Sequence, residues 1–357
     1  MKTTRLLALF LFLALSSQFV FLNGCRNKNN EPVPTPVKMK YAWVVGDEDS
    51  THYGMILFTQ DGGVTWHRQG EGSPALLGVN IMDVWAIDTN NVWAVGTGNR
   101  ILKTIDRGKT WARITGPNTG SIADLSSISM VGSSDIWISG DKGIVYHSKD
   151  GGNSWIMFDT AFFHNGLMQG VYAINSQIAY VAGGIGARGF IARTSDGGLT
   201  WDSVVPENNY NRNEWIGVKA TDPNHIIVYG VKAHYLFSAD AGQSWKNDSV
   251  PGTGGTEGAD INCLTMLTAQ TWWGAFDYDG IYITTDNGTS WTTQSSAGPG
   301  AMYLFGIDYY DRNQAIIVAK SSLSLTGKIM ITSNGGNTWE FKYQSRSRLC
   351  KVSFIKN

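Results

Sequence analysis

Seven copies of one short turn motif constrain the fold of this chain more than any other feature of its sequence. The motif reads Ser/Thr-x-Asp-x-Gly-x-Ser/Thr-Trp, with Asn in place of Asp in the last copy. The first copy ends at Trp66, and the following copies end 45, 44, 46, 44, 46 and 48 residues further on. A constant period of this size indicates one supersecondary unit repeated many times. Together with the turn chemistry it favours an all-β chain built from propeller blades.

Each repeat contains four candidate strands. In the repeat at residues 125–158, three short apolar runs precede the motif, and a fourth begins at its Trp155. Turn residues separate these runs, as expected for antiparallel hairpins. The apolar pattern of the first strand recurs in the other repeats, at Ile81/Val84/Ala86, Met168/Val171/Ala173, Trp215/Val218/Ala220, Ile261/Leu264/Met266 and Leu304/Ile307/Tyr309.

The two ends of the repeat region complement each other. The first-strand pattern appears once more at Leu349/Val352/Phe354, with no strand after it. Residues 41–46 read as a second strand with no first strand before it. We therefore predict a single seven-bladed β-propeller over residues 39–357, in which the C-terminal strand completes the blade of Trp66. Such closure removes exposed sheet edges.

The N-terminal segment reads as a targeting signal. Lys2 and Arg5 precede an apolar run over residues 6–22, which is typical of a secretory signal peptide. The sequence ending at Cys25 resembles a bacterial lipobox, which implies a signal peptide over residues 1–24 and a lipidated Cys25. Residues 25–38 are rich in Pro and Asn and are expected to form an extended tether. We expect a lipid-anchored envelope protein. We place it in the outer membrane because the residue after the anchor cysteine is Arg26, and not the Asp that is associated with inner-membrane retention.

Composition excludes several functional classes. The net charge is −1, so no overall field attracts nucleic acid, and we expect membrane contact only through the lipid. Beyond the anchor only Cys263 and Cys350 remain, and the repeat alignment places them on blades that are not neighbours. We interpret both as small buried residues, and predict no disulfide, no metal, no cofactor and a monomeric chain.

The motif itself is predicted to be structural. Its Gly suits a turn with positive φ, its Asp can accept backbone N–H bonds, and its Trp is expected to pack between neighbouring sheets. Seven copies around a ring cannot converge on one substrate, which argues against catalysis or calcium binding. The predicted structural residues are Asp61, Trp66, Asp106, Trp111, Asp150, Trp155, Asp196, Trp201, Asp240, Trp245, Asp286, Trp291, Asn334 and Trp339.

These motifs resemble the Asp-boxes, or BNR repeats, of sialidases, some glycoside hydrolases and sortilin-type receptors. The strand Val92–Gly96 followed by residues 101–111 is similar, more specifically, to the photosystem II stability/assembly-factor family of propellers. The resemblance covers roughly residues 40–357. It implies a seven-bladed fold and, in photosynthetic organisms, an assembly chaperone that binds a reaction-centre protein; in other bacteria the role is mostly undefined.

A binding site is expected on the face opposite the motifs, where the loops differ from blade to blade. That face carries the connections from fourth to first strands and from second to third strands. We predict that it binds a protein, or alternatively a glycan, and that the tether leaves from the motif face. The candidate binding residues are His52, Tyr53, Arg100, Lys142, Phe163, His164, Arg188, Tyr210, Arg212, His234 and Tyr278.

An enzymatic function is the less favoured alternative. A sialidase needs three converging arginines, a Tyr nucleophile and an acidic partner, and its usual Arg-Ile-Pro sequence is absent. Asp277 and Asp279 could act as acid and base, but two Asp residues on a short hairpin more often mark a turn. The sequence shows no nucleophile motif, phosphate loop or His cluster. We therefore predict a non-enzymatic protein-binding module.

Overall fold

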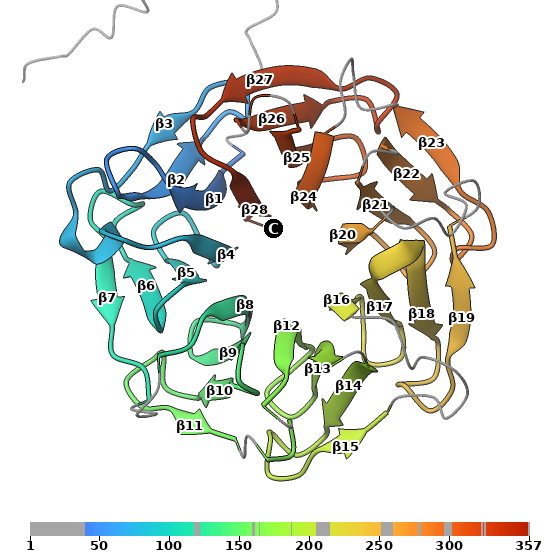
Figure 1. Ribbon diagram of the computed structural model, residues 1–357. Helices are drawn as coiled ribbons and strands as arrows, with labels where there is room; N and C mark the ends of the chain where they lie inside the picture. Colours follow the sequence, from blue (N-terminus) through green and yellow to red (C-terminus); the bar gives the residue numbers. More distant parts are fainter. Residues whose placement is uncertain are drawn as a thin grey trace, which may run out of the picture. The chain divides into compact units, whose positions relative to one another are not determined.

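The computed structural model describes residues 40–117, 122–158, 161–163, 165–186, 188–204, 215–250, 260–277, 280–295, 302–322, 324 and 326–355. These residues form seven four-stranded antiparallel sheets arranged around a central channel (Figure 1). The prediction of an all-β, seven-bladed propeller is confirmed. The predicted signal peptide, Cys25 and the tether lie outside the described residues.

Each blade runs outward from the channel in the order first to fourth strand, and blades are numbered here by the order of their motifs. Blade 1 comprises β28 (Leu349–Phe354), β1 (Ala42–Glu48), β2 (Gly54–Thr59) and β3 (His67–Arg68). Blade 2 comprises β4 (Ile81–Ala86), β5 (Val92–Gly96), β6 (Arg100–Thr104) and β7 (Ala112–Ile114). Blade 3 comprises β8 (Leu125–Val131), β9 (Asp135–Gly140), β10 (Val145–Ser148) and β11 (Ile156–Met157). Blade 4 comprises β12 (Leu167–Ala173), β13 (Ala179–Ile185), β14 (Arg188–Thr194) and β15 (Asp202–Ser203).

The remaining blades repeat this order. Blade 5 comprises β16 (Trp215–Ala220), β17 (Ile226–Gly230), β18 (His234–Ser238) and β19 (Lys246–Ser249). Blade 6 comprises β20 (Ile261–Met266), β21 (Trp272–Phe276), β22 (Gly280–Thr284) and β23 (Thr292–Ser295). Blade 7 comprises β24 (Met302–Tyr309), β25 (Ala315–Ser321), β26 (Gly327–Thr332) and β27 (Glu340–Gln344). Two short 3₁₀ helices, η1 (Pro74–Leu76) and η2 (Val231–Ala233), lie in connections.

The C-terminal strand closes the ring as predicted. β28 pairs antiparallel with β1, in a register that places Val44 opposite Val352. At the end of this pair, Arg348 donates two hydrogen bonds of 2.9 Å to the carboxylate of Asp47. The two ends of the propeller are thus held together by a β-ladder and a bidentate ion pair.

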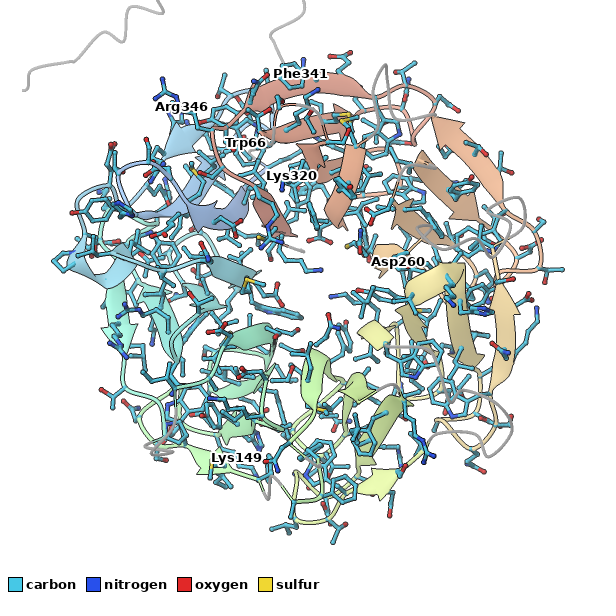
Figure 2. All side chains as sticks on the ribbon, viewed as in Figure 1. Trp66, Lys149, Asp260, Lys320, Phe341 and Arg346 are labelled. Atoms are coloured by element: carbon cyan, nitrogen blue, oxygen red, sulfur yellow. The ribbon has the colours of Figure 1, made fainter. Side chains whose placement is uncertain are left out.

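The hydrophobic core consists of seven clusters, each between two neighbouring blades. One cluster joins Trp43 of blade 1 to Val92 of blade 2 and includes Trp111. The other clusters repeat this arrangement around the ring, each with one motif Trp. The motif tryptophans thus pack between neighbouring sheets. Figure 2 shows side chains filling the space between the blades, with Trp66 inside the rim and Phe341 on its outer side.

The seven motifs adopt one hydrogen-bond pattern. In the first, Asp61 Oδ1 accepts from the Thr65 amide at 2.9 Å, and Oδ2 accepts from the Thr65 hydroxyl at 2.5 Å. Thr59 donates its hydroxyl to Asp61 and accepts from the Gly63 amide at 2.9 Å. The equivalent bonds to Asp106, including that from Thr110, lower the pKa of this carboxyl to about 2. The motif carboxylates are therefore used as acceptors within their own turns.

The seventh motif shows that an amide can replace the carboxylate. Asn334 Oδ1 accepts from the Thr338 amide at 3.0 Å, while its Nδ2 donates to the Thr338 hydroxyl at 2.8 Å. The turn keeps the same contacts because the hydroxyl can act as donor or acceptor.

The first described residue lies at the motif face of the ring. The Lys40 amide donates to the Gln60 carbonyl, and the Lys40 carbonyl accepts from the Gly62 amide, at 3.1 and 3.0 Å. The chain therefore enters the propeller beside the first motif. Within the described ranges, no helix has the length and apolar character needed to cross a bilayer.

Candidate functional site: the central cavity

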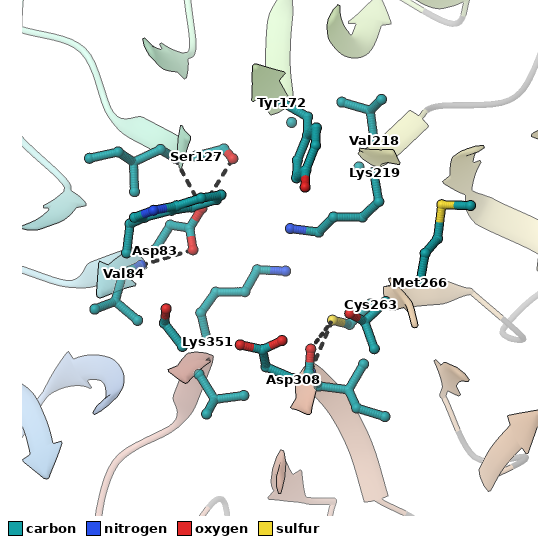
Figure 3. A pocket seen from close by; sticks show the side chains of 18 of the residues that line it. Asp83, Val84, Ser127, Tyr172, Val218, Lys219, Cys263, Met266, Asp308 and Lys351 are labelled. Atoms are coloured by element: carbon teal, nitrogen blue, oxygen red, sulfur yellow. Dashed lines mark hydrogen bonds between the residues drawn. The ribbon is translucent and has the colours of Figure 1, made fainter. Parts of the chain in front are cut away.

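A cavity of about 500 Å³ lies in the central channel (Figure 3). Side chains of the first strands line it, and Ile87, Thr221 and Leu267 line it beyond the ends of β4, β16 and β20. Those three residues follow the first strands, so the cavity extends toward the motif face. None of the described loop-face candidates lines it. The sequence prediction did not identify this cavity.

At one level of the channel, polar side chains accept hydrogen bonds from backbone amides at the free inner edges of the first strands. Asp83 Oδ2 of blade 2 accepts from the Ile128 amide of blade 3 at 3.0 Å. Cys263 Sγ of blade 6 accepts from the Ile307 amide of blade 7 at 3.0 Å. Because each first strand has a partner on only one side, these contacts provide acceptors for amides that face the neighbouring blade.

Two residues further along the first strands, other polar side chains accept hydrogen bonds from amides of the neighbouring blade in the same way. The Ser129 hydroxyl of blade 3 accepts from the Ala173 amide of blade 4 at 2.9 Å. The Ser353 hydroxyl accepts from the Ala86 amide at 3.0 Å, and Asp308 Oδ2 accepts from the Phe354 amide at 2.8 Å. The polar residues of the channel thus link neighbouring blades.

The two cysteines occupy different surroundings. Cys263 and Cys350 are buried and free, which confirms the prediction of small buried residues without a disulfide. Burial raises the pKa of Cys350 to about 12, so its thiol stays protonated at neutral pH. What the sequence did not show is that Cys263 lies in the channel, where its sulfur bonds to the next blade.

Two glycines in the channel wall allow close packing of blades 4 and 5. A Cβ on Gly170 would lie 2.8 Å from the Cα of Gly217, so β12 and β16 approach each other too closely for a side chain. The Tyr229 hydroxyl of the second strand occupies the space above Gly217, where a Cβ would lie 2.2 Å from it. At Gly170 and Gly217 the cavity is therefore lined by backbone and by Tyr229.

Two lysines supply the cationic groups of the cavity. Lys219 of β16 and Lys351 of β28 both extend into its open centre (Figure 3). Lys219 Nζ lies 5.5 Å from the centroid of the Tyr172 ring, and Lys351 Nζ donates to the Phe305 carbonyl at 3.3 Å. The cavity therefore combines two ammonium groups with the carboxylates of Asp83 and Asp308.

The loop-face residues predicted from sequence are spread around the ring. His52 and Tyr53 lie on blade 1, where His52 is exposed and its Nδ1 lies 3.7 Å from the Glu48 carboxylate. Arg188 is exposed at the start of β14, and His234 begins β18, where burial lowers its pKa. These side chains form no single cluster. His164, Tyr210, Arg212 and Tyr278 lie outside the described residues.

The prediction of Phe163 as a surface residue is wrong. Its side chain is completely buried, and its ring packs edge-on against Phe190 and Trp201, with centroids 6.1 and 5.3 Å away. The aromatic run in this loop turns inward because it covers the end of the core between blades 3 and 4. Apolar loop residues are equally compatible with either position from sequence alone.

Two candidates lie on the loop face of neighbouring blades, Arg100 on blade 2 and Lys142 on blade 3. Arg100 Nη2 donates to the Leu77 carbonyl at 3.2 Å, and Lys142 Nζ donates to the Ile122 carbonyl. Leu77 and Ile122 are 49% and 73% exposed. Burial and the nearby Arg113 lower the pKa of Arg100. We call Leu77, Arg100, Ile122 and Lys142 the blade 2–3 patch.

One carboxyl group on the loop face, that of Asp277, has a raised pKa. Burial raises the pKa of Asp277 to about 6, although the Asn262 amide donates to its carboxylate at 2.6 Å. The nearby Asp260 raises it further. Asp260 Oδ1 accepts from the Lys232 amide at 2.9 Å, so this neighbour also links two blades.

Comparison with known proteins finds a family match over part of the chain. The sequence profile of the family described as photosynthesis system II assembly factor YCF48 matches residues 75–212. A photosystem II assembly lipoprotein Ycf48 from Synechococcus sp. (strain CC9902) is 30% identical over 134 residues, which are 36% of this chain and 38% of that protein. The match therefore spans well under half of that relative.

A second relative belongs to a different functional class. A xyloglucanase from Paenibacillus sp. is 22% identical over 351 residues, covering 86% of this chain but 32% of the enzyme. Among solved structures, one described as YCF48 bound to D1 peptide superimposes with a TM-score of 0.58 at 21% identity, over 74% of this chain and 82% of that one. At this identity the superposition establishes the fold. The chain is thus a Ycf48-like seven-bladed propeller, carrying the repeat of the photosystem II assembly factor family over residues 75–212.

Proposed function

We propose that this chain is a non-enzymatic envelope lipoprotein whose loop face binds a segment of a protein partner. The blade 2–3 patch carries the proposal. It presents the exposed side chains of Leu77 and Ile122 beside two cations, Arg100 and Lys142. Exposed aliphatic residues with adjacent basic groups suit an apolar segment flanked by acidic residues. The patch lies within the region that matches the assembly-factor family, one structure of which is described as bound to a D1 peptide.

The patch can be tested by crosslinking in the native envelope followed by identification of the captured partner. Ile122→Asp should reduce capture at least tenfold, because it places a carboxylate where an apolar contact is expected. Ile105→Asp is the matched control, since Ile105 is 67% exposed in the motif turn of blade 2, on the opposite face. Equal capture by both folded variants would contradict the assignment.

The lipid anchor is a separate part of the proposal. It is supported by the sequence around Cys25 and by entry of the chain at the motif face beside Lys40, opposite the blade 2–3 patch. A tether on the motif face would leave the loop face directed away from the membrane. Cys25→Ser should move the protein from the outer-membrane fraction to the soluble fraction and abolish labelling with a fatty-acid analogue. Persistence of the label would contradict lipidation at this residue.

A glycoside hydrolase is the second candidate, favoured by the relation to a xyloglucanase and by Asp277. A carboxyl group with a pKa near 6 is suited to donate a proton to a leaving group, provided that a second carboxylate lies across the bond. Hydrolysis of xyloglucan or a fluorogenic sialoside by the full chain, lost in Asp277→Asn, would support this candidate. Turnover that is unaffected by the substitution would exclude a role for Asp277.

A further inference from the structure

The motif turns share their hydrogen bonds but differ at one outward-facing position. The side chain at the sixth position, between the Gly and the last Ser or Thr, is exposed in all seven turns. In three turns this side chain donates to the carbonyl of the third motif residue, as Asn153 does at 2.6 Å and Asn337 at 2.9 Å. A polar residue at the sixth position can therefore stabilise its own turn. From blade 1 to blade 7 the residues there are Val64, Lys109, Asn153, Leu199, Gln243, Thr289 and Asn337.

Two turns carry an aliphatic side chain at this position, which cannot make that bond. Leu199 is 84% exposed and Val64 is 52% exposed. Each of them leaves apolar surface in water and lacks the side-chain donor that is present in three other turns. The stability of the turn therefore does not explain the choice of Leu199 or Val64.

The two aliphatic residues lie on one half of the ring, together with two lysines. Lys109 and Lys149 are exposed in the turns of blades 2 and 3, between the turn of Val64 in blade 1 and that of Leu199 in blade 4. The motif turns of blades 5 to 7 contain no lysine and no exposed large aliphatic residue. Apolar side chains accompanied by lysines are typical of protein surfaces that lie against a lipid headgroup layer.

The same face receives the N-terminal part of the chain. Lys40 bonds to the first motif turn through its backbone, and its side chain donates to Gln314 of blade 7. Residues 26–39 separate Lys40 from Cys25. A segment of this length spans at most roughly 50 Å when fully extended. A lipid on Cys25 would therefore keep the motif face close to the bilayer.

We propose that the motif turns of blades 1 to 4 contact the surface of the membrane that holds the lipid anchor, an inference that rests on the anchor of the proposed function. Val64 and Leu199 enter the boundary between headgroups and acyl chains, while Lys109 and Lys149 reach lipid phosphates. A membrane surface needs no converging groups, so side chains spread over four turns can contact it together. Net charge alone predicted contact through the lipid only, and the uneven distribution of side chains around the ring changes that expectation.

Site-directed spin labelling tests the contact. The full lipidated chain is placed in vesicles of phosphatidylethanolamine and phosphatidylglycerol, with the label on Leu199→Cys or, as the matched control, on Thr289→Cys at the same motif position of blade 6. Cys263 and Cys350 are buried, so the label attaches to the new cysteine. Oxygen concentrates in lipid, whereas a nickel chelate stays in water. The ratio of label collisions with oxygen to those with the chelate should be at least threefold higher for Leu199→Cys than for Thr289→Cys.

Flotation of the protein with the vesicles reports the lipid anchor separately from the contact. Equal and low collision ratios in floating protein would overturn the contact and leave the anchor intact. Equal and high ratios would show that the whole motif face lies on the membrane, and would overturn the assignment to blades 1 to 4. Protein that does not float would overturn the anchor, and the contact with it. Val64→Cys, compared with Asn337→Cys of the neighbouring blade 7, decides the question if Leu199→Cys fails to fold.

Discussion

The motif turns and the channel-lining strands occur seven times each, yet they differ in how far their side chains vary. The turns keep one set of hydrogen bonds in all seven blades, even where Asn334 replaces Asp. Equivalent channel positions carry unlike residues, such as Asp83, Cys263 and Lys351. Uniform chemistry in every blade indicates a structural role, because a binding site on a ring needs unlike groups that converge. The channel satisfies that condition and the turns do not.

The largest expected effect concerns a motif tryptophan. Trp111 is 5% exposed and packs in the cluster between blades 1 and 2. Trp111→Ala should lower the free energy of unfolding by about 3–5 kcal/mol, because it removes buried area and leaves a cavity. Phe341→Ala, at an aromatic side chain that is 54% exposed, should cost under about 1 kcal/mol. Equal effects in urea denaturation would contradict the structural role of the motif.

A smaller effect is expected from a channel residue that links two blades. Ser129→Ala removes the acceptor of the Ala173 amide and should cost about 1–3 kcal/mol, because a buried N–H group loses its partner. Ser127→Ala is the matched control, since the Ser127 hydroxyl donates to Asp83 and leaves no amide without an acceptor. We expect this variant to lose about 1 kcal/mol or less. Similar unfolding midpoints for Ser129→Ala and Ser127→Ala would contradict the role of the Ser129 hydroxyl in linking blades 3 and 4.

The motif carboxylate should matter less than the motif tryptophan. Asp61→Ala removes the acceptor of the Thr65 amide and hydroxyl, and should cost about 1–2 kcal/mol, as for the loss of a helix cap. Asp61→Asn should cost under about 0.5 kcal/mol, because Asn334 makes the same contacts in the seventh motif. An Asn variant as unstable as the Ala variant would show that the negative charge is required.

The motif carboxylates should also make the stability of the protein depend on pH. Hydrogen bonds from Thr110 lower the pKa of Asp106 to about 2, against an ordinary value of 3.8. A lowered folded-state pKa contributes stability that is present above pH 3.8 and is lost as the pH falls toward 2. Asp106→Asn should therefore flatten the decline of the urea midpoint between pH 4 and pH 2. An unchanged slope would indicate that Asp106 titrates alike in the folded and unfolded chain.

Sequence reasoning reached the fold because the information it needed is local and repeated. The spacing of the motif tryptophans and the first-strand pattern around Val352 predicted seven blades and their closure by β28. The cavity was missed because Lys219 and Lys351 are 132 residues apart and meet only through ring closure. Phe163 was misplaced because the direction of a loop side chain depends on the space left by its neighbours. The positive φ at the fourth motif position was also missed, because three copies of the motif have no glycine there.

The fourth motif position adopts positive φ in all seven turns, although three copies have no glycine there. Arg107, Ala241 and Asn287 have φ values of 64, 62 and 58°. The left-handed conformation costs a residue with a Cβ roughly 1–2 kcal/mol, whereas glycine loses roughly 0.5–1 kcal/mol through its freer unfolded state. Ala241→Gly should therefore stabilise the protein by about 0.5–1 kcal/mol, and Gly335→Ala, at φ 70°, should destabilise it. The Ala241 carbonyl still accepts from Tyr180 in the variant, so a fall in Tm for Ala241→Gly would mean that this turn is not strained.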